Sequence, residues 1–296
     1  MANVHAGYRG IATFSALPAP GYVRFSDGAI SAKQSVNAPD LIMGDYDHNA
    51  YNYEKIEVNG NMSGPVTETF ASGAGGLLQW ACGRNNCGLL TPSDVELFYY
   101  CDENQGAAYK YQQFLGMYAN SVTFTCTAGD VATWSMDVLA ASAGAFDVTA
   151  PPSYTTAEKL ITWDQTSLVL TPSTDINEGV PAAYQTFELT VANNIEPVYA
   201  IKTGVQNLFP YEMVPGMRTI TGNFTVFDIQ NIPGSDDWNG YSAGSEGSLQ
   251  FNIGATSVTL KCRFARIDPK IAVGPITSTV AFVGVTHQTG FPWDTP

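Results

Sequence analysis

Short runs of β-branched and aromatic residues, separated by glycine, proline, asparagine and aspartate, recur along the whole chain. Clear examples are YEKIEV, VELFYYC, NSVTFTCT, QTFELTVA, TSVTLKCRF and ITSTVAFVGVT. In SVTFTC the period-two alternation places Val122, Phe124 and Cys126 on one face, and the hydroxyl residues between them on the other. One buried and one exposed face is typical of antiparallel sheets. The sequence therefore predicts a mostly β fold with minor helix.

Helical signals are few. The strongest candidate is 66–81 (VTETFASGAGGLLQWA), whose apolar residues could share one side, although Gly73, Gly75 and Gly76 weaken its middle. A second segment, 103–115 (ENQGAAYKYQQFL), is expected to form a turn or a longer loop.

Composition narrows the functional classes. The chain has 296 residues, 45% of them hydrophobic and 12% aromatic, which excludes a disordered protein. With 27 acidic against 13 basic residues, the formal net charge is −14. A DNA-binding surface needs clustered Lys and Arg, so conventional DNA binding is not expected. The acidic excess divides almost evenly between the two halves of the chain.

The N-terminus lacks a basic start followed by an apolar core, and no apolar stretch approaches the ~20 residues that span a bilayer. We therefore expect a protein made in the cytoplasm, with no membrane partner. Five cysteines form an odd set, which argues against a disulfide framework. Cys82 and Cys87 have a C-x4-C spacing, but no second Cys or His pair completes a zinc site, so neither metal nor another cofactor is expected.

The middle of the chain has the composition of a linker. Residues 149–158 (TAPPSYTTAE) combine two prolines with small polar residues and show no periodicity. Similar segments flank it in the same order: KIEVNGNMSG (55–64) with RTITGNFTVF (218–227), and SVTFTC (121–126) with SVTLKC (257–262). These matches predict a duplication, with one domain over 1–150 and a second over 151–296.

The best-matching segments, GNMSGPVTE, MYANSVTFTCTAGDVATWSMDVLA and MRTITGNFTVFD, resemble the tail tube proteins of long-tailed bacteriophages. The resemblance covers nearly the whole chain as two tandem tube domains, each an antiparallel β-sandwich or barrel-like unit. It implies a structural protein of the virion tail, assembled in the bacterial host cytoplasm. Its subunits would form rings that stack into a hollow tube for DNA passage, and inner strands of neighbouring subunits would join into a continuous lumen wall.

If one chain supplies two domains, three chains would form a six-domain ring. The resemblance also implies partners: further copies of the chain, the tape measure, baseplate and terminator proteins, and a sheath if the tail contracts. DNA would pass through the lumen without specific binding. A repulsive, acidic lumen wall is one hypothesis for the charge imbalance, and solubility at high concentration is the other.

Two aromatic and polar loops are candidate contact sites between subunits or rings. The first includes Asp45, Asp47, His48, Tyr51 and Tyr53, and its counterpart includes Leu208, Phe209, Pro210 and Tyr211. By resemblance these loops would reach an adjacent subunit, and aromatic side chains suit such contacts because they bury large areas at little entropic cost. A cation site in the GDYDHN segment is the weaker alternative, since no further ligand pattern follows it.

No catalytic motif emerges. Asp236 and Asp237 beside Trp238 resemble a carboxylate pair over a sugar-stacking ring, but turn chemistry explains GSDDWNG equally well. None of the histidines lies near a nucleophile elbow, so we expect no enzyme. Two alternatives to the tube stay open: a baseplate or distal-tail ring protein with the same domain, and a bacterial β-sandwich adhesin or carbohydrate-binding module with Trp238 and Trp293 as sugar platforms.

Overall fold

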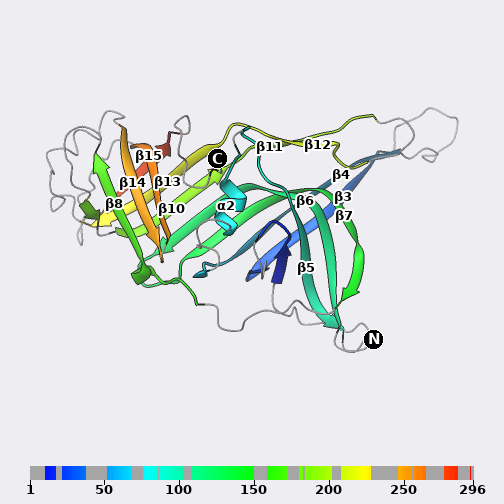
Figure 1. Cartoon of the computed structure of the whole chain (residues 1–296), viewed down its shortest axis with the longest axis horizontal. Helices are drawn as coiled ribbons and strands as arrows, with labels where there is room; N and C mark the ends of the chain where they lie inside the picture. Colours follow the sequence, from blue (N-terminus) through cyan, green and yellow to red (C-terminus); the bar gives the residue numbers. More distant parts are fainter. Residues whose placement is uncertain are drawn as a thin grey trace, which may run out of the picture.

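The computed structural model describes residues 11–17, 22–37, 52–68, 76–85, 87–102, 108–149, 159–172, 180–182, 184–201, 208–227, 246–254, 256–264, 277–285 and 294. As the sequence predicts, this part of the chain is mostly antiparallel strands with minor helix (Figure 1). Fourteen strands form one continuous sheet, and a separate hairpin pairs two more. No helix in these ranges is long and apolar enough to cross a membrane.

The strands fall into two sets along the chain. The first set is β1 (Ile11–Phe14), β2 (Tyr22–Arg24), β3 (Asp27–Asn37), β4 (Asn52–Pro65), β5 (Ser93–Asp102), β6 (Ala108–Thr127) and β7 (Thr133–Thr149). The second set is β8 (Thr166–Pro172), β9 (Val180–Ala182), β10 (Tyr184–Ala192), β13 (Thr219–Phe227), β14 (Glu246–Ile253), β15 (Thr256–Phe264) and β16 (Thr277–Gly284). The separate hairpin is β11 (Ile195–Val198) with β12 (Glu212–Pro215), and the helical pieces are α2 (Leu77–Cys82) and the 3₁₀ turn η2 (Trp163–Gln165).

Both sets are arranged in the same order. The first is β3-β4-β7-β6-β5-β1-β2, and the second is β10-β13-β16-β15-β14-β8-β9, with every neighbour antiparallel. Each strand of the second set therefore has a counterpart in the first, in the same sequence order. We call the two sets the first unit and the second unit. A repeated order of this length is what a duplicated domain produces.

Two glycines mark equivalent points in the two units. Gly60 in β4 pairs with Ile30, and a Cβ at Gly60 would lie 2.1 Å from the Ala29 oxygen of β3. Gly222 in β13 pairs with Leu189, and its Cβ would lie 2.2 Å from the Glu188 oxygen of β10. In both units the neighbouring backbone approaches too closely for any side chain, which explains the shared Gly-Asn pair in the two sequence segments.

Strand β6 joins the units. Along one edge its first part pairs with β5, and Ser121–Thr127 then pairs with β10 of the second unit. The core is continuous across this junction, because the Phe124 ring of β6 lies 6.1 Å from Phe187 and 5.6 Å from Phe251 of the second unit. Figure 1 shows β10 and β13 extending in opposite directions between the second unit and the first.

Two expectations about local structure need correction. Of the helix expected over 66–81, Glu68 and Leu77–Cys82 are helical, whereas Val66 and Thr67 continue the β4 edge, and residues 69–75 lie outside the described ranges. Within the segment expected to be a loop, residues 108–115 belong to β6, where long-range pairing with β5 and β7 overrides local propensity.

The SVT segments lie in equivalent strands but at different points along them. SVTLKC pairs with β14, whereas SVTFTC lies beyond the part of β6 that pairs with the equivalent strand β5. The sequence match therefore identified the right strands in the wrong register. The predicted domain boundary at 150/151 stays a prediction, because residues 150–158 lie outside the described ranges.

Candidate functional site

One face of the sheet extends across both units and is lined mainly by hydroxyl and amide side chains. In β4, β7, β6, β10, β13, β16 and β15, most alternate residues are buried and the residues between them point to this face, and pairing with β4 extends the face onto the edge strand β3. We call it the polar face. Its members are Asp27, Ala29, Ser31, Lys33, Glu57, Asn59, Asn61, Ser63, Thr133, Ser135, Asp137, Leu139, Ser121, Thr123, Thr125, Thr186, Glu188, Thr190, Ala192, Thr219, Thr221, Asn223, Thr225, Thr279, Ala281, Val283, Ser257, Thr259, Lys261 and Arg263.

Register places these side chains in rows that cross the strands. Ser63, Ser135, Thr123, Thr190 and Thr221 form one such row, running from β4 in the first unit to β13 in the second. Within it, the hydroxyls of Thr123 and Thr190 are 2.9 Å apart, so the row is hydrogen-bonded across the junction of the units. Cross-strand threonine pairs of this kind stabilise a sheet by roughly 0.2–1 kcal/mol each.

Hydrogen bonds between side chains also connect neighbouring strands of the polar face within each unit. The hydroxyl of Ser121 donates to Asp137 Oδ2 at 2.8 Å, and the hydroxyls of Thr225 and Thr279 are 3.0 Å apart. Because these groups satisfy one another, the face is polar without needing a high density of charge.

Charges on the polar face nearly balance. The acidic members are Asp27, Glu57, Asp137 and Glu188, and the basic members are Lys33, Lys261 and Arg263. Glu57 also has an ion partner beside the face, because Lys55 Nζ lies 2.5 Å from its carboxylate. The face therefore does not share the strong acidity of the whole chain.

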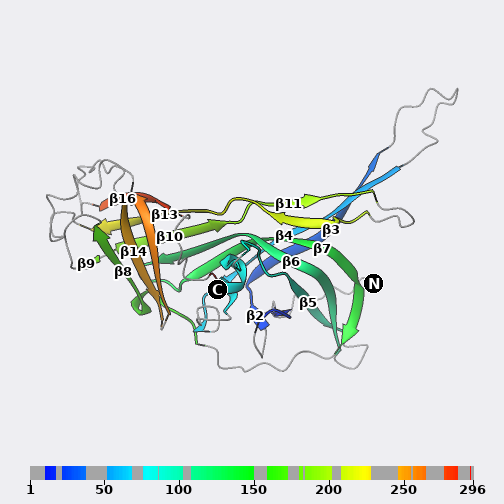
Figure 2. The same ribbon diagram turned by 45° about the horizontal axis from the view of Figure 1, so that its top comes forward.

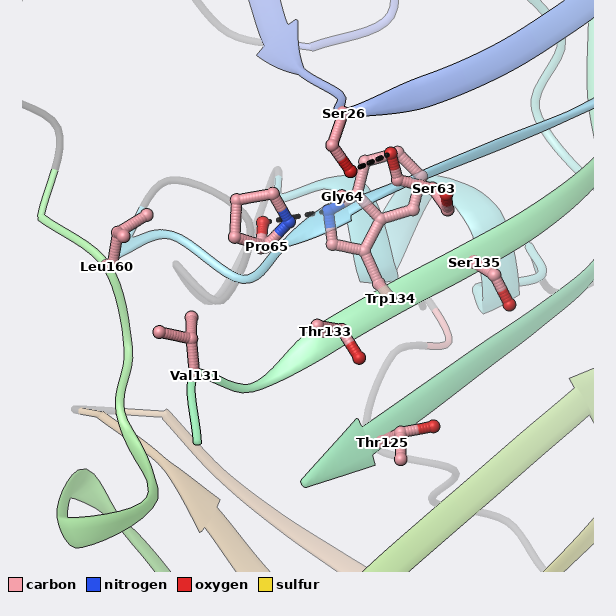
Figure 3. A pocket seen from close by; sticks show the side chains of 10 residues that line it. All are labelled: Ser26, Ser63, Gly64, Pro65, Thr125, Val131, Thr133, Trp134, Ser135 and Leu160. Carbon is pink, nitrogen blue, oxygen red and sulfur yellow. Dashed lines mark hydrogen bonds between the residues drawn. The ribbon is translucent and has the colours of Figure 1, made fainter. Parts of the chain in front are cut away.

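The two hollows described on this side of the sheet lie on the polar face. One, of about 490 Å³, is lined by Ser63, Thr125, Thr133 and Ser135, with Ser26 and Leu160 at its rim (Figure 3). Figure 3 shows the hydroxyls of Thr125, Thr133 and Ser135 pointing away from the Trp134 ring, whose Nε1 donates to Pro65 O at 3.0 Å. The other, of about 470 Å³, is lined by Ser31, Asn59, Asn61 and Asp137 among others.

Strand β3 is an open edge of this sheet. Its counterpart β10 pairs with β13 on one side and with β6 on the other. Within the described part of the chain, β3 pairs with β4 alone. Ser31, Ala32, Lys33 and Gln34 are all exposed along it. An unpaired strand edge is a template for pairing with another chain.

The two predicted contact loops belong to equivalent connections in the two units. The first lies between β3 and β4, and the second, which contains β11 and β12, lies between β10 and β13. Both views show the β11–β12 hairpin alongside β3 and β4 (Figures 1 and 2). The amide of Ile56 donates to Leu208 O at 2.8 Å, and the Tyr199 hydroxyl donates to Ile56 O at 3.2 Å.

The predicted residues of these loops divide into inward and outward positions. Pro210 is buried, Leu208 is half-buried, and Phe209 packs against the core, whereas the Tyr211 side chain is 60% exposed. Of the residues predicted in the first loop, Tyr53 belongs to β4. Asp45, Asp47, His48 and Tyr51 lie outside the described residues. The contact role of both loops stays a prediction.

Exposed apolar side chains form a row on and beside the β11–β12 hairpin, of which the sequence singled out Tyr211 alone. Val198, Ile201, Tyr211, Val214 and Met217 are 39%, 105%, 60%, 41% and 79% exposed. Exposed apolar groups gathered on one hairpin indicate a contact surface. The alternation of Val214 with buried Met213 is the signal that could have identified it.

A buried polar cluster fixes the first unit to the second beneath the hairpin. Asn193, which is fully buried, donates from Nδ2 to Ala81 O of α2 and to Ala119 O of β6, at 2.8 and 2.9 Å. Arg218 donates to Cys82 O at 3.0 Å and forms a bidentate ion pair with Asp294 at 2.7 and 3.0 Å. Residues of the second unit thus satisfy the last carbonyls of α2, which a helix end leaves without partners.

Two of the described thiols, Cys82 and Cys262, are unsuited to nucleophilic chemistry. Burial raises the pKa of the Cys82 thiol far above its ordinary value, although the nearby Arg218 opposes this. Burial also raises the pKa of Cys262 to about 12. Both side chains are therefore protonated at neutral pH and serve as small apolar groups. Asp236, Asp237, Trp238 and all three histidines lie outside the described residues.

Comparison with known proteins identifies the family of this chain. A search of curated proteins finds no match to the chain. A family model described as phage tail tube protein matches residues 3–284, which is nearly the whole length. The chain therefore belongs to the phage tail tube protein family and is a structural component of a phage tail.

Proposed function

We propose that this chain assembles into rings of three copies, and that the rings stack into the hollow tail tube through which DNA passes. The observation that supports this most strongly is the repeated strand order, because three chains with two equivalent units each would supply six units to a ring. The chain acts as a wall component and performs no catalysis.

The ring closes through the open edge of β3. Within the chain, β10 covers its equivalent edge by pairing with β6 over Ser121–Thr127. A second copy would cover the β3 edge by the same kind of antiparallel pairing, through a strand of its second unit. The resulting ring would have no free strand edge, which removes the risk of uncontrolled edge pairing.

Stacking uses the β11–β12 hairpin and the adjoining β3–β4 connection. Contact with the next ring would cover the exposed Ile201, Tyr211 and Val214 side chains. Burial of apolar area stabilises such a contact by about 25 cal/mol per Å² before the entropic cost of association. Tape measure, terminator and baseplate proteins, and a sheath in a contractile tail, are the other partners we propose.

Negative-stain microscopy of the purified chain tests the proposal. We expect long tubes with a central channel, formed spontaneously or after addition of an initiator ring. Isolated rings that never extend would favour a baseplate or distal-tail ring protein. Lasting monomers that bind a glycan array would contradict the proposal and favour the adhesin alternative.

A hairpin variant separates ring formation from stacking. Ile201→Ser with Val214→Ser removes exposed apolar area that has no role in the core, so we expect single rings in place of tubes. Trp163→Ser is the matched control, since Trp163 is 48% exposed and belongs to η2 instead of the hairpin. Normal tubes from the hairpin variant would contradict the stacking assignment.

A further inference from the structure

The carboxylate of Asp294 accepts hydrogen bonds from two distant segments beneath the β11–β12 hairpin. Just before β13, Nη1 and Nη2 of Arg218 donate to its two oxygens at 2.7 and 3.0 Å. Just after α2, the Arg84 amide donates to Oδ1 at 2.9 Å. Only 7% of the Arg218 side chain is exposed, so the carboxylate is the counter-ion of a buried guanidinium. Asp294 thus joins residues that lie 76 and 210 positions away along the chain.

Two sets of contacts connect Asp294 to the hairpin, and the first lies at the end of β12. Arg218 follows β12 closely in the chain and is bound to Asp294 directly. Nη2 of Arg84, whose amide also binds Asp294, donates to Gly216 O at 2.9 Å. The residues on both sides of Met217 are therefore held in place, and Met217 itself is 79% exposed.

The second set of contacts lies under the two strands of the hairpin. Arg84 forms an isolated β-bridge with Leu90, and Leu90 packs with Ile195 of β11 and Met213 of β12 in a small apolar cluster. A two-stranded hairpin is at best marginally stable in water by itself. The order of this hairpin therefore depends on the segment that Arg84 and Asp294 hold beneath it.

We propose that Asp294 is a positioning residue whose carboxylate fixes the β11–β12 hairpin, and with it the exposed apolar row, on the body of the subunit. We call Asp294, Arg84 and Arg218 the latch. The proposal deepens the proposed function and rests on it in one respect, because the apolar row is the proposed stacking surface. Loss of the latch should release the hairpin and leave the large sheet folded.

Electrostatics explains why a carboxylate is needed at this point. Burial and the positive charge of Arg218 lower the pKa of Arg84, and Asp294 acts in the opposite direction. Without Asp294, the two guanidinium groups would repel each other with no anion between them, and Arg218 would lose the carboxylate that accompanies its burial. Movement of either arginine displaces the end of β12, because Gly216 is bound to one of them and Met217 adjoins the other.

Hydrogen exchange of free subunits tests the latch. In Asp294→Ala, we expect the amides of Ile195 and Tyr211, which are hydrogen-bonded in the folded hairpin, to exchange about ten- to hundredfold faster. Amides of β14 and β15 should keep their wild-type rates. Asp130→Ala is the matched control, because it removes the same charge from an exposed residue in the β6–β7 turn and should leave both regions unchanged.

A second variant separates the latch from the cost of burying Arg218 without Asp294. Adding Arg218→Met to Asp294→Ala replaces the buried guanidinium with an apolar side chain of similar length, so the stability of the sheet should recover. Hairpin exchange should stay fast, because the bond between the end of β12 and residue 294 is still missing. If Asp294→Ala does not fold, the double variant decides alone. Wild-type hairpin exchange in either variant, or an equal rise in β14 and β15, would overturn the inference.

This measurement does not depend on tubes. Wild-type chains that form no tubes would contradict the proposed function and leave the exchange result intact, so the two failures are distinguishable. Where wild-type tubes form, Asp294→Ala should give single rings, as expected for the hairpin variant. Normal tubes from a variant whose hairpin exchanges fast would overturn the role of the latch in stacking.

Discussion

The two units share one strand order and differ at one edge. In the second unit, the outer edge of β10 is covered by β6 of the same chain, whereas in the first unit the equivalent edge of β3 has no partner within the described chain. The covered edge shows how the open one can be satisfied. The pairing of β6 with β10 inside the chain is therefore the model that we propose for the pairing of β3 with another chain.

The connection that precedes the Gly-Asn strand is described in the second unit only. It contains β11 and β12, whereas the equivalent connection of the first unit, residues 38–51, lies outside the described residues. The β11–β12 hairpin places exposed apolar side chains beside β4.

The largest effect is expected from proline substitutions that block pairing at the open edge of β3. Alternate N–H groups of an edge strand point to its neighbour and to the open side, so Ser31→Pro and Ala32→Pro affect different edges of β3. The variant whose proline faces outward should keep its thermal stability and lose tube formation completely. Microscopy and thermal unfolding of both variants measure this.

Val191→Pro in β10 is the matched control, because β10 is paired on both sides. It should unfold or strongly destabilise the monomer, by about 3 kcal/mol or more if the cost resembles that of an interior proline. If both β3 variants remain stable and form normal tubes, β3 is not the closing edge.

Core truncations test whether the units fold together. Met62 and Phe224 lie two residues beyond the equivalent glycines and are 1% and 0% exposed. Met62→Ala should cost about 2–5 kcal/mol and Phe224→Ala about 3–5 kcal/mol. Because one core spans both units, each variant should show a single urea transition followed by any probe. Two separate transitions would contradict a shared core.

Substitution of the equivalent glycines should give matching, smaller losses. A Cβ at Gly60 or Gly222 would meet backbone oxygen at 2.1 or 2.2 Å, so Gly60→Ala and Gly222→Ala should each destabilise by roughly 1–3 kcal/mol. Gly144→Ala is the control, since the nearest atom to its Cβ would be 3.5 Å away. Urea midpoints compare the three, and a neutral Gly60→Ala beside a costly Gly222→Ala would weaken the equivalence.

The smallest expected effect is a dependence of stability on alkaline pH, to which two groups of the second unit contribute. Burial raises the pKa of Tyr184 from 10.0 to about 12 and that of Cys262 from 9.0 to about 12. The folded state holds these protons more tightly than the unfolded state, so stability is full below about pH 9 and falls as pH rises toward 12. Urea midpoints at several pH values should decline less steeply in Cys262→Val and Tyr184→Phe. An unchanged slope in both variants would contradict this assignment.

Much of the fold could be predicted from the sequence. Period-two alternation identified the strands, including the buried side of Val122, Phe124 and Cys126, which are 3%, 2% and 1% exposed. The Gly-Asn pairs identified equivalent strands, since each glycine is required by a close backbone approach. Local patterns of this kind are visible in one chain segment at a time.

The remaining features depend on contacts between distant segments. The register of the SVT segments is set by pairing with β5 and β14, which no spacing within them reveals. The sequence placed Val66 in a helix because it does not reveal that the Val66 amide donates to Ala132 O, at 2.8 Å and some 66 positions later in the chain. The polar face was missed for the same reason: its rows combine single threonines and serines from eight strands.

Cryo-electron microscopy of the assembled tube tests the central claim most directly. The account predicts rings of three chains and six similar units, with β3 of each chain paired to the second unit of the next. Rings of six chains, or rings in which the β3 edge is left unpaired, would contradict it.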